Sequence, residues 1–185
     1  MNVLEAINDE GHGLQLTFSW IGDRYAQQVD YCGPTGTTPL LTSLEGNDQV
    51  VWPPSPPLQQ LTFEERPRGP IALLIGMAGT SHWSVSIETD TARGEIVFDV
   101  ACRISQQPLF LGTTYLSTQT VAAAQGKNVS LAAGVTLESL PVCEEVADAT
   151  GAIEIADSQI KIAAVSPEVG ETPRWKYRLA LQLPS

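Results

Sequence analysis

The sequence predicts an all-β, mostly antiparallel fold: a single β-sandwich domain over residues 1–185 with at most two short helices. Several segments alternate apolar and polar residues with a period of two, which is typical of strands with one buried face. Fifteen glycines and thirteen prolines interrupt the chain too often for long helices. Hydrophobic residues make up 43% and charged residues 17%, which excludes a disordered chain and a coiled coil. A calycin-like β-barrel is the alternative architecture.

The N-terminal part predicts a β-hairpin followed by a loop. Four apolar residues between 14 and 20 alternate with polar ones, Gly22-Asp23 offers a turn, and 24–31 resumes the alternation. Residues 32–49 are rich in Gly, Pro, Thr and Ser, which predicts a loop. The proline run 53–57 lacks amide donors, so it should form an extended edge or crossover segment.

The centre of the chain has the clearest strand pattern. Residues 71–77 form a continuous apolar run, which predicts a strand buried on both faces. Residues 83–104 alternate on either side of a polar connection, which predicts a second hairpin. Its predicted apolar face consists of Trp83, Val85, Ile87, Ile96, Phe98, Val100 and Ile104. Trp20, Trp83 and Trp175 lie on the apolar sides of their strands, so all three are predicted core residues.

The C-terminal half predicts further short strands at 109–116, 152–155, 160–165 and 175–183. Segments 120–125 and 141–150 have compositions compatible with two short helices. Residues 129–137 fit a strand and a turn instead.

The charge balance excludes whole classes of partner. Twenty-one acidic residues face ten basic ones, for a net charge of -11 and a pI near 4.4. A field of this sign repels phosphate backbones and anionic lipid headgroups, so we expect neither nucleic-acid nor membrane binding. The first ten residues lack the basic and apolar regions of a signal peptide. We therefore expect a cytoplasmic protein, or a secreted one only if a leader has been removed.

Cysteine and acidic residues predict no metal site and no cofactor. Cys32, Cys102 and Cys143 are odd in number and far apart, which indicates free thiols rather than a disulfide framework. No CxxC or Cys/His cluster is present to bind zinc. The acid-rich stretch 148–157 lacks the ligand spacing of a calcium loop.

His82 is the residue best suited to catalysis, and it begins the second hairpin. Ser84 shares its face of the strand, and Asp99 could lie across the hairpin on that face, as a Ser/His/Asp arrangement would need. Glu88 and Glu95 on the same face complete a set of candidate carboxylates for acid–base chemistry. No GxSxG nucleophile elbow accompanies them, and a histidine that hydrogen-bonds loop amides is the favoured interpretation of His82.

The polar outer face of this hairpin and one tryptophan are the candidates for ligand binding. His82, Ser84 and Arg103 belong to that face, which could hold a sugar or a peptide. The simpler interpretation is the solvated side of a sheet, with Asp99 and Arg103 as a same-face charge pair. Trp52 lies beside the proline run with no strand pattern to explain it, so it could stack on a sugar or anchor a partner.

Three hypotheses follow from these observations. The first is a non-enzymatic binding module for a carbohydrate, a peptide or another small ligand or protein, monomeric or homodimeric. The second is a carboxylate-dependent hydrolase that uses Asp99, Glu88 or Glu95 with His82. The third is a calycin-like barrel that holds a small apolar ligand among Phe18, Trp20, Phe98 and Trp175.

Overall fold

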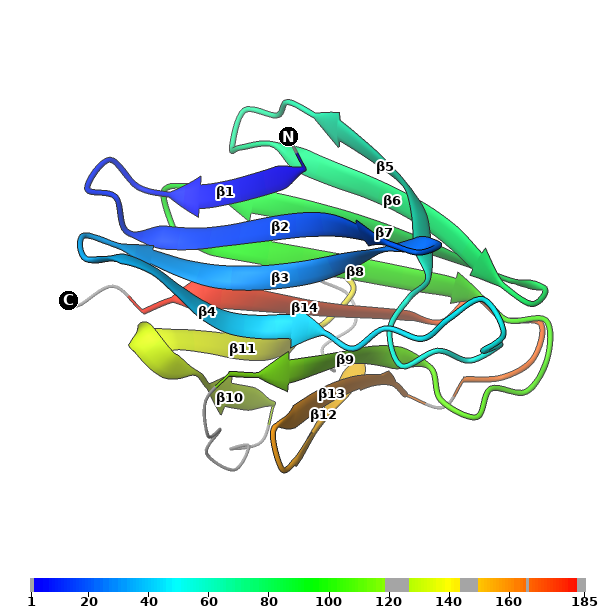
Figure 1. Cartoon of the computed structure of the whole chain (residues 1–185). Coiled ribbons are helices and arrows are strands. Elements are labelled where there is room, and N and C mark those ends of the chain that lie inside the picture. Colours follow the sequence, from blue (N-terminus) through cyan, green and yellow to red (C-terminus); the bar gives the residue numbers. More distant parts are fainter. Residues whose placement is uncertain (1, 119–126, 144–149, 166, 183–185) are drawn as a thin grey trace.

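The protein folds into two stacked antiparallel β-sheets, shown by a computed structural model that describes residues 2–118, 127–143, 150–165 and 167–182 (Figure 1). In spatial order, sheet A contains β1 (Val3–Ile7), β2 (Gly13–Ile21), β3 (Arg24–Gly33), β4 (Gly36–Ser43), β9 (Gly112–Ser117), β13 (Gln159–Ala164) and β12 (Gly151–Ala156). Sheet B contains β10 (Asn128–Ser130), β11 (Val135–Leu140), β14 (Arg174–Leu181), β8 (Glu95–Arg103), β7 (Ser81–Asp90), β6 (Ile71–Ala78) and β5 (Leu58–Glu64). This arrangement confirms the predicted β-sandwich. The barrel alternative is wrong, because the sheets do not close on each other.

Both predicted hairpins are confirmed, as β2–β3 and β7–β8. All seven residues of the predicted apolar face of the second hairpin are buried. The proline run 53–57 lies in the segment that crosses from β4 in sheet A to β5 in sheet B, as predicted. The predicted helix at 120–125 and most of that at 141–150 lie outside the described residues. The one helical element described is a single 3₁₀ turn, Ala132–Gly134, between β10 and β11.

The core joins the two sheets through aromatic side chains. The ring of Phe98 on β8 stacks on Tyr177 of β14, with centroids 4.7 Å apart. The Tyr177 hydroxyl lies 2.8 Å from the hydroxyl of Tyr115, which comes from β9 in the opposite sheet. Trp175 donates its indole N–H to Thr113 across the same gap, at 3.5 Å. Trp83 and Trp175 are therefore core residues, as predicted.

Two predictions in the N-terminal part are wrong. Residues 36–43, predicted as loop, form β4. Pro39 is tolerated there because it lies at a β-bulge opposite Val29 and Asp30, where a missing amide donor does little harm. Trp20, predicted in the core, is 52% exposed because it lies at the end of β2 and packs only on Tyr25. A further strand, β1, pairs with β2 where the sequence suggested no element.

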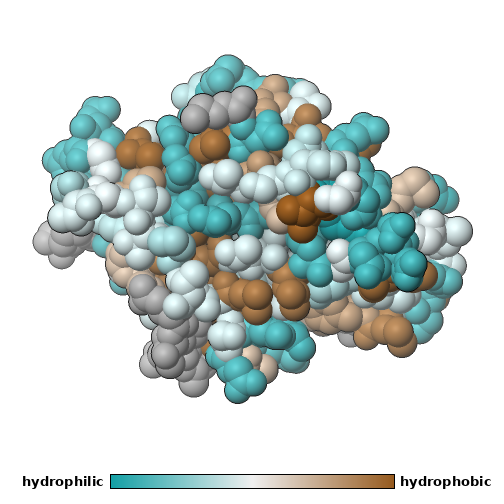
Figure 2. Space-filling model, in the orientation of Figure 1, coloured by the Kyte–Doolittle hydropathy of each residue, from teal (hydrophilic) through white to brown (hydrophobic). Residues whose placement is uncertain are grey.

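The prediction that residues 71–77 are buried on both faces is also wrong. Ile71, Ala72 and Leu74 of β6 are buried, but Ile75 and Met77 are 51% and 45% exposed. The outer face of β6 has no second layer of structure over it, so its aliphatic side chains meet solvent. Figure 2 shows the opposite side of the molecule, where sheet A is in front and hydrophobic residues form separate patches among hydrophilic ones.

Gly76 lies where β6 approaches the start of β5 most closely. A methyl group at this position would sit 1.8 Å from the Pro57 carbonyl oxygen. We predict that Gly76→Ala lowers the free energy of unfolding by about 1–3 kcal/mol, because the backbone must move to relieve the clash. Urea denaturation measures this loss. Ser84→Ala on neighbouring β7 is the control and should stay within about 0.5 kcal/mol of the parent; equal stability of the two variants would contradict the prediction.

Candidate functional site

The outer face of sheet B brings several of the predicted ligand-binding residues together. Directly paired residues of antiparallel strands project to the same face of a sheet. Met77, His82 and Arg103 form one such row across β6, β7 and β8. Ile75, Ser84 and Ala101 form the next row. The register thus places aliphatic side chains beside the polar residues that the sequence singled out.

These two rows line a cavity of about 430 Å³, which we call the Arg103 cavity. Its eleven lining residues are Gln59, Gln60, Ile75, Gly76, Met77, His82, Trp83, Ser84, Ala101, Arg103 and Thr172. Three of the four predicted ligand-binding residues, His82, Ser84 and Arg103, are among them. The fourth, Trp52, is not. None of the eleven is acidic, although acidic residues outnumber basic ones two to one in the chain.

The floor of the Arg103 cavity is aliphatic and held in place from the edge strand. The Gln59 side chain donates to the Met77 carbonyl oxygen and accepts from the Met77 amide, both at 3.1 Å. These bonds replace strand pairing at the point where β5 has a register shift. The side chain of Trp83 is 4% exposed, so it offers no accessible ring face to a ligand. Ile75 and Met77 were missed as site residues, because only the register shows which face of β6 they occupy.

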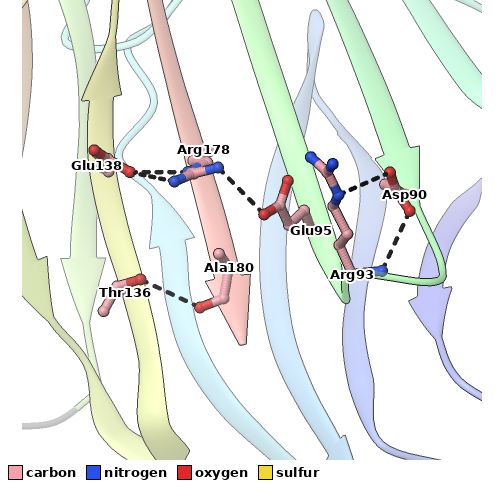
Figure 3. A network of polar contacts seen from close by, with 7 residues as sticks. All are labelled: Asp90, Arg93, Glu95, Thr136, Glu138, Arg178 and Ala180. Carbon is pink, nitrogen blue, oxygen red and sulfur yellow. Dashed lines mark hydrogen bonds and ion pairs between the residues drawn. The ribbon is translucent and has the colours of Figure 1, made fainter. Parts of the chain in front are cut away.

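Arg103 differs from most arginines of the protein in lacking a carboxylate partner. On the same outer face, Arg174 binds Asp99 through two hydrogen bonds of 3.2 and 2.6 Å. Arg178 bridges Glu138 and Glu95, at 2.7 and 3.2 Å (Figure 3). Within the described part of the chain, Arg68 and Arg103 are the two arginines that form no ion pair. The Arg103 guanidinium is therefore available to a ligand.

The predicted charge pair between Asp99 and Arg103 is wrong. Asp99 lies opposite Ser86 and binds Arg174 instead. Residues four apart along one strand are about 13 Å apart, too far for an ion pair.

The candidate catalytic residues occupy separate parts of the face. His82 lies opposite Arg103, while Asp99 lies opposite Ser86, about 13 Å further along the hairpin. Glu88 and Glu95 line a different cavity of about 500 Å³ at the far end of the hairpin, beside Arg68. Acid–base or triad chemistry needs the acting groups within hydrogen-bond reach of one another or of one substrate atom. The register keeps His82 apart from all three carboxylates.

Trp52 lies at a separate cavity of about 450 Å³, which we call the Trp52 cavity and which shares no lining residue with the Arg103 cavity. Its half-buried indole packs edge-to-face on Trp83, with ring centroids 5.8 Å apart. The other lining residues are Leu44, Pro54, Leu109, Phe110, Thr114, Gln159 and Lys161. Thr114 and Lys161 are a directly paired row on the outer face of sheet A.

Several titratable groups lie inside the sandwich rather than in either cavity. Burial raises the pKa of Tyr115 and Tyr177 well above the usual range, because their hydroxyls lie between the sheets. Burial likewise raises the pKa of the Cys102 thiol to about 12. Burial raises the pKa of Glu45 to about 7, although a 2.6 Å hydrogen bond from Ser43 opposes the shift. The second Glu45 oxygen has no hydrogen-bond partner.

Comparisons with protein-family models, with curated proteins and with solved structures gave no match. Among the described residues, no group of three or more His, Cys, Asp and Glu side chains could hold a metal ion. Over the same residues, no helix has the length and apolar character that a bilayer crossing requires.

The raised pKa of Glu45 predicts a stability that falls as pH rises. Below about pH 4.5 the carboxyl is protonated in both folded and unfolded chains, so it contributes nothing to pH dependence. Between pH 4.5 and 7 the unfolded chain releases its proton first, and above pH 7 the full loss of stability persists. Glu45→Gln stays neutral and keeps an acceptor for Ser43, so it should gain about 3 kcal/mol over the parent between pH 4 and pH 8.

Urea denaturation at pH 4, 6 and 8 measures this gain. Glu10→Gln, on an exposed turn, is the matched control and should differ from the parent by the same small amount at each pH. A stability difference between Glu45→Gln and the parent that does not change with pH would show that Glu45 is ordinarily solvated.

Proposed function

We propose that the protein is a non-enzymatic binding module that holds a peptide segment of a partner in the Arg103 cavity, on the outer face of sheet B. One observation carries the proposal: an arginine without a carboxylate partner stands beside an exposed aliphatic floor, in a cavity with no acidic lining residue. Exposed aliphatic side chains next to an unpaired cation fit a ligand that has an apolar part and an acidic part.

The cavity supplies a separate group for each part of such a ligand. Ile75 and Met77 offer apolar contact, and the flexible thioether of methionine adapts to side chains of different shape. Arg103 offers planar, bidentate recognition of a carboxylate. His82 and Ser84 add hydrogen-bonding groups between the two.

A peptide suits this surface better than a carbohydrate. Sugar sites depend on an aromatic ring face, and the one aromatic lining residue of the cavity, Trp83, is buried in the core. An aliphatic side chain followed or preceded by Asp, Glu or a terminal carboxylate matches the floor and the guanidinium. We therefore propose that the ligand is a peptide with an aliphatic side chain next to an acidic group.

Binding is also preferred to the alternative of a carboxylate hydrolase. That alternative needs His82 and a carboxylate in one concave site, whereas Asp99 and Glu95 are engaged by Arg174 and Arg178. Carboxylates neutralised by arginines in this way stabilise a sheet surface and are poorly placed to transfer protons.

The test is selection of a displayed random heptapeptide library on the immobilised full chain. We expect enriched peptides to pair an aliphatic residue with an acidic one. Isothermal titration calorimetry with one enriched peptide should show binding that Arg103→Gln weakens roughly tenfold to a hundredfold, because a hydrogen bond to a charged group is lost.

Arg68→Gln is the matched control for this experiment. Arg68 is the other arginine without an ion pair, and it lines the cavity at the far end of the same face. It should leave peptide affinity unchanged. Enriched peptides without acidic residues, or equal binding by Arg103→Gln and the parent, would rule out the proposed site.

A further inference from the structure

We infer that the Trp52 cavity is a second, independent binding site, and that its ligand is a neutral saccharide. The cavity includes the outer-face row of Thr114 and Lys161 in sheet A, and it shares no lining residue with the Arg103 cavity. It combines aromatic rings, a buried hydroxyl without a partner, an amide and an ammonium group.

The apolar wall of the Trp52 cavity is rigid. Trp52 is fixed by its edge-to-face contact with Trp83 in the core and by the prolines that follow it in the chain. Phe110 packs over Gly112 so closely that a methyl group there would lie 2.8 Å from its ring. Rings held in this way can receive the C–H face of a pyranose without losing conformational freedom on binding.

The polar wall contains a hydroxyl that the protein leaves unsatisfied. Thr114 is 1% exposed, and its Oγ1 atom has no hydrogen-bond partner within the described part of the chain. Its backbone groups, by contrast, are bonded to Ser55. A buried hydroxyl without a partner costs stability, so such an atom in a cavity wall points to a ligand that bonds it.

Lys161 and Gln159 complete the polar wall. Lys161 lies in the same cross-strand row as Thr114, and it forms no ion pair with its other neighbour, Glu154, or with any described carboxylate. Together the wall offers hydroxyl, amide and ammonium groups, which can both donate to and accept from sugar hydroxyls. Five apolar residues with three hydrogen-bonding ones match the two-sided chemistry of a sugar ring.

The strongly negative net charge of the chain favours a neutral sugar over an acidic one. Lys161 is the one basic residue on the described strands of sheet A apart from the buried Arg24. Acidic residues elsewhere on these strands include Glu5, Asp30 and Glu154. A uronic acid or sulfated sugar would approach against this field, while a neutral saccharide would not.

The experiment titrates the full chain by calorimetry with four neutral tetrasaccharides: cellotetraose, maltotetraose, xylotetraose and chitotetraose. We expect at least one to bind. Thr114→Val should weaken that binding about tenfold while leaving the Tm equal or higher, because it removes the unpaired hydroxyl and keeps the shape of the side chain. Trp52→Ala should weaken binding at least tenfold, and Lys161→Ala tests the same site should Trp52→Ala fail to fold.

Two controls separate this site from the rest of the molecule. Trp20→Ala removes the exposed tryptophan outside the cavity and should leave sugar affinity unchanged. Arg103→Gln should also leave it unchanged, so failure of the peptide proposal does not affect this test. The inference is overturned if none of the four sugars binds, if Thr114→Val binds as tightly as the parent, or if Thr114→Val instead abolishes binding of a peptide selected on the full chain.

Discussion

The structure depends on the contact between the inner faces of the two sheets. The rings of Phe98, Tyr177 and Tyr115 are in contact one after another from sheet B to sheet A. The two tyrosine hydroxyls lie 2.8 Å apart, and that of Tyr115 donates to the side-chain oxygen of Gln27. A hydroxyl pair placed between apolar layers tolerates little displacement, because each oxygen would lose a partner that water cannot replace. The side chains of the inner faces are therefore used for packing the sheets together. Both cavities are lined in part by side chains of the outer faces.

The outer face of sheet B shows how an edge detail shapes a surface site. Gly76 lets β5 approach β6 closely, and Gln59 bonds both backbone groups of Met77 where regular pairing is interrupted. β6, the neighbour of the edge strand β5, therefore stays an ordered strand although β5 is irregular at this point. The outward side chains of β6 then keep fixed positions beside Arg103, and the proposed peptide site depends on this arrangement.

Period-two alternation predicted the sandwich, both hairpins and the buried face of the second hairpin, because alternation and burial are directly linked in strands. The alternation did not predict burial correctly where burial depends on whether another part of the molecule covers that face of the strand. A run of apolar residues at 71–77 does not reveal that no second layer covers β6, and Trp20 follows its strand's pattern but lies past the end of the covered region. β4 was missed because Pro39 is a strand breaker except at a bulge, and bulges leave no clear sequence signal. Among the residues that line the two cavities, His82, Ser84 and Arg103 were predicted from their shared face and Trp52 from its place beside the proline run. Ile75, Met77 and Thr114 were not predicted, because their placement depends on the register and on the fold of the crossover.

The net charge of -11 is distributed very unevenly over the fold. Sheet B with the loops inside 58–103, 128–140 and 174–181 contains seven basic and seven acidic residues. The remaining three basic and fourteen acidic residues belong to the rest of the chain, so that part accounts for the whole net charge. Sheet B as a whole thus carries no net charge that would repel an acidic peptide, although Glu171, counted with the remaining part, is the neighbour in sequence of Thr172 in the Arg103 cavity. An uncharged ligand meets no electrostatic repulsion from the acidic remainder of the chain, which is compatible with the neutral saccharide inferred for the Trp52 cavity. The charge balance of the segments therefore agrees with the two ligand classes proposed from the side chains of the cavities, because the balanced part contains the proposed acidic-peptide site and the acidic part contains the proposed sugar site.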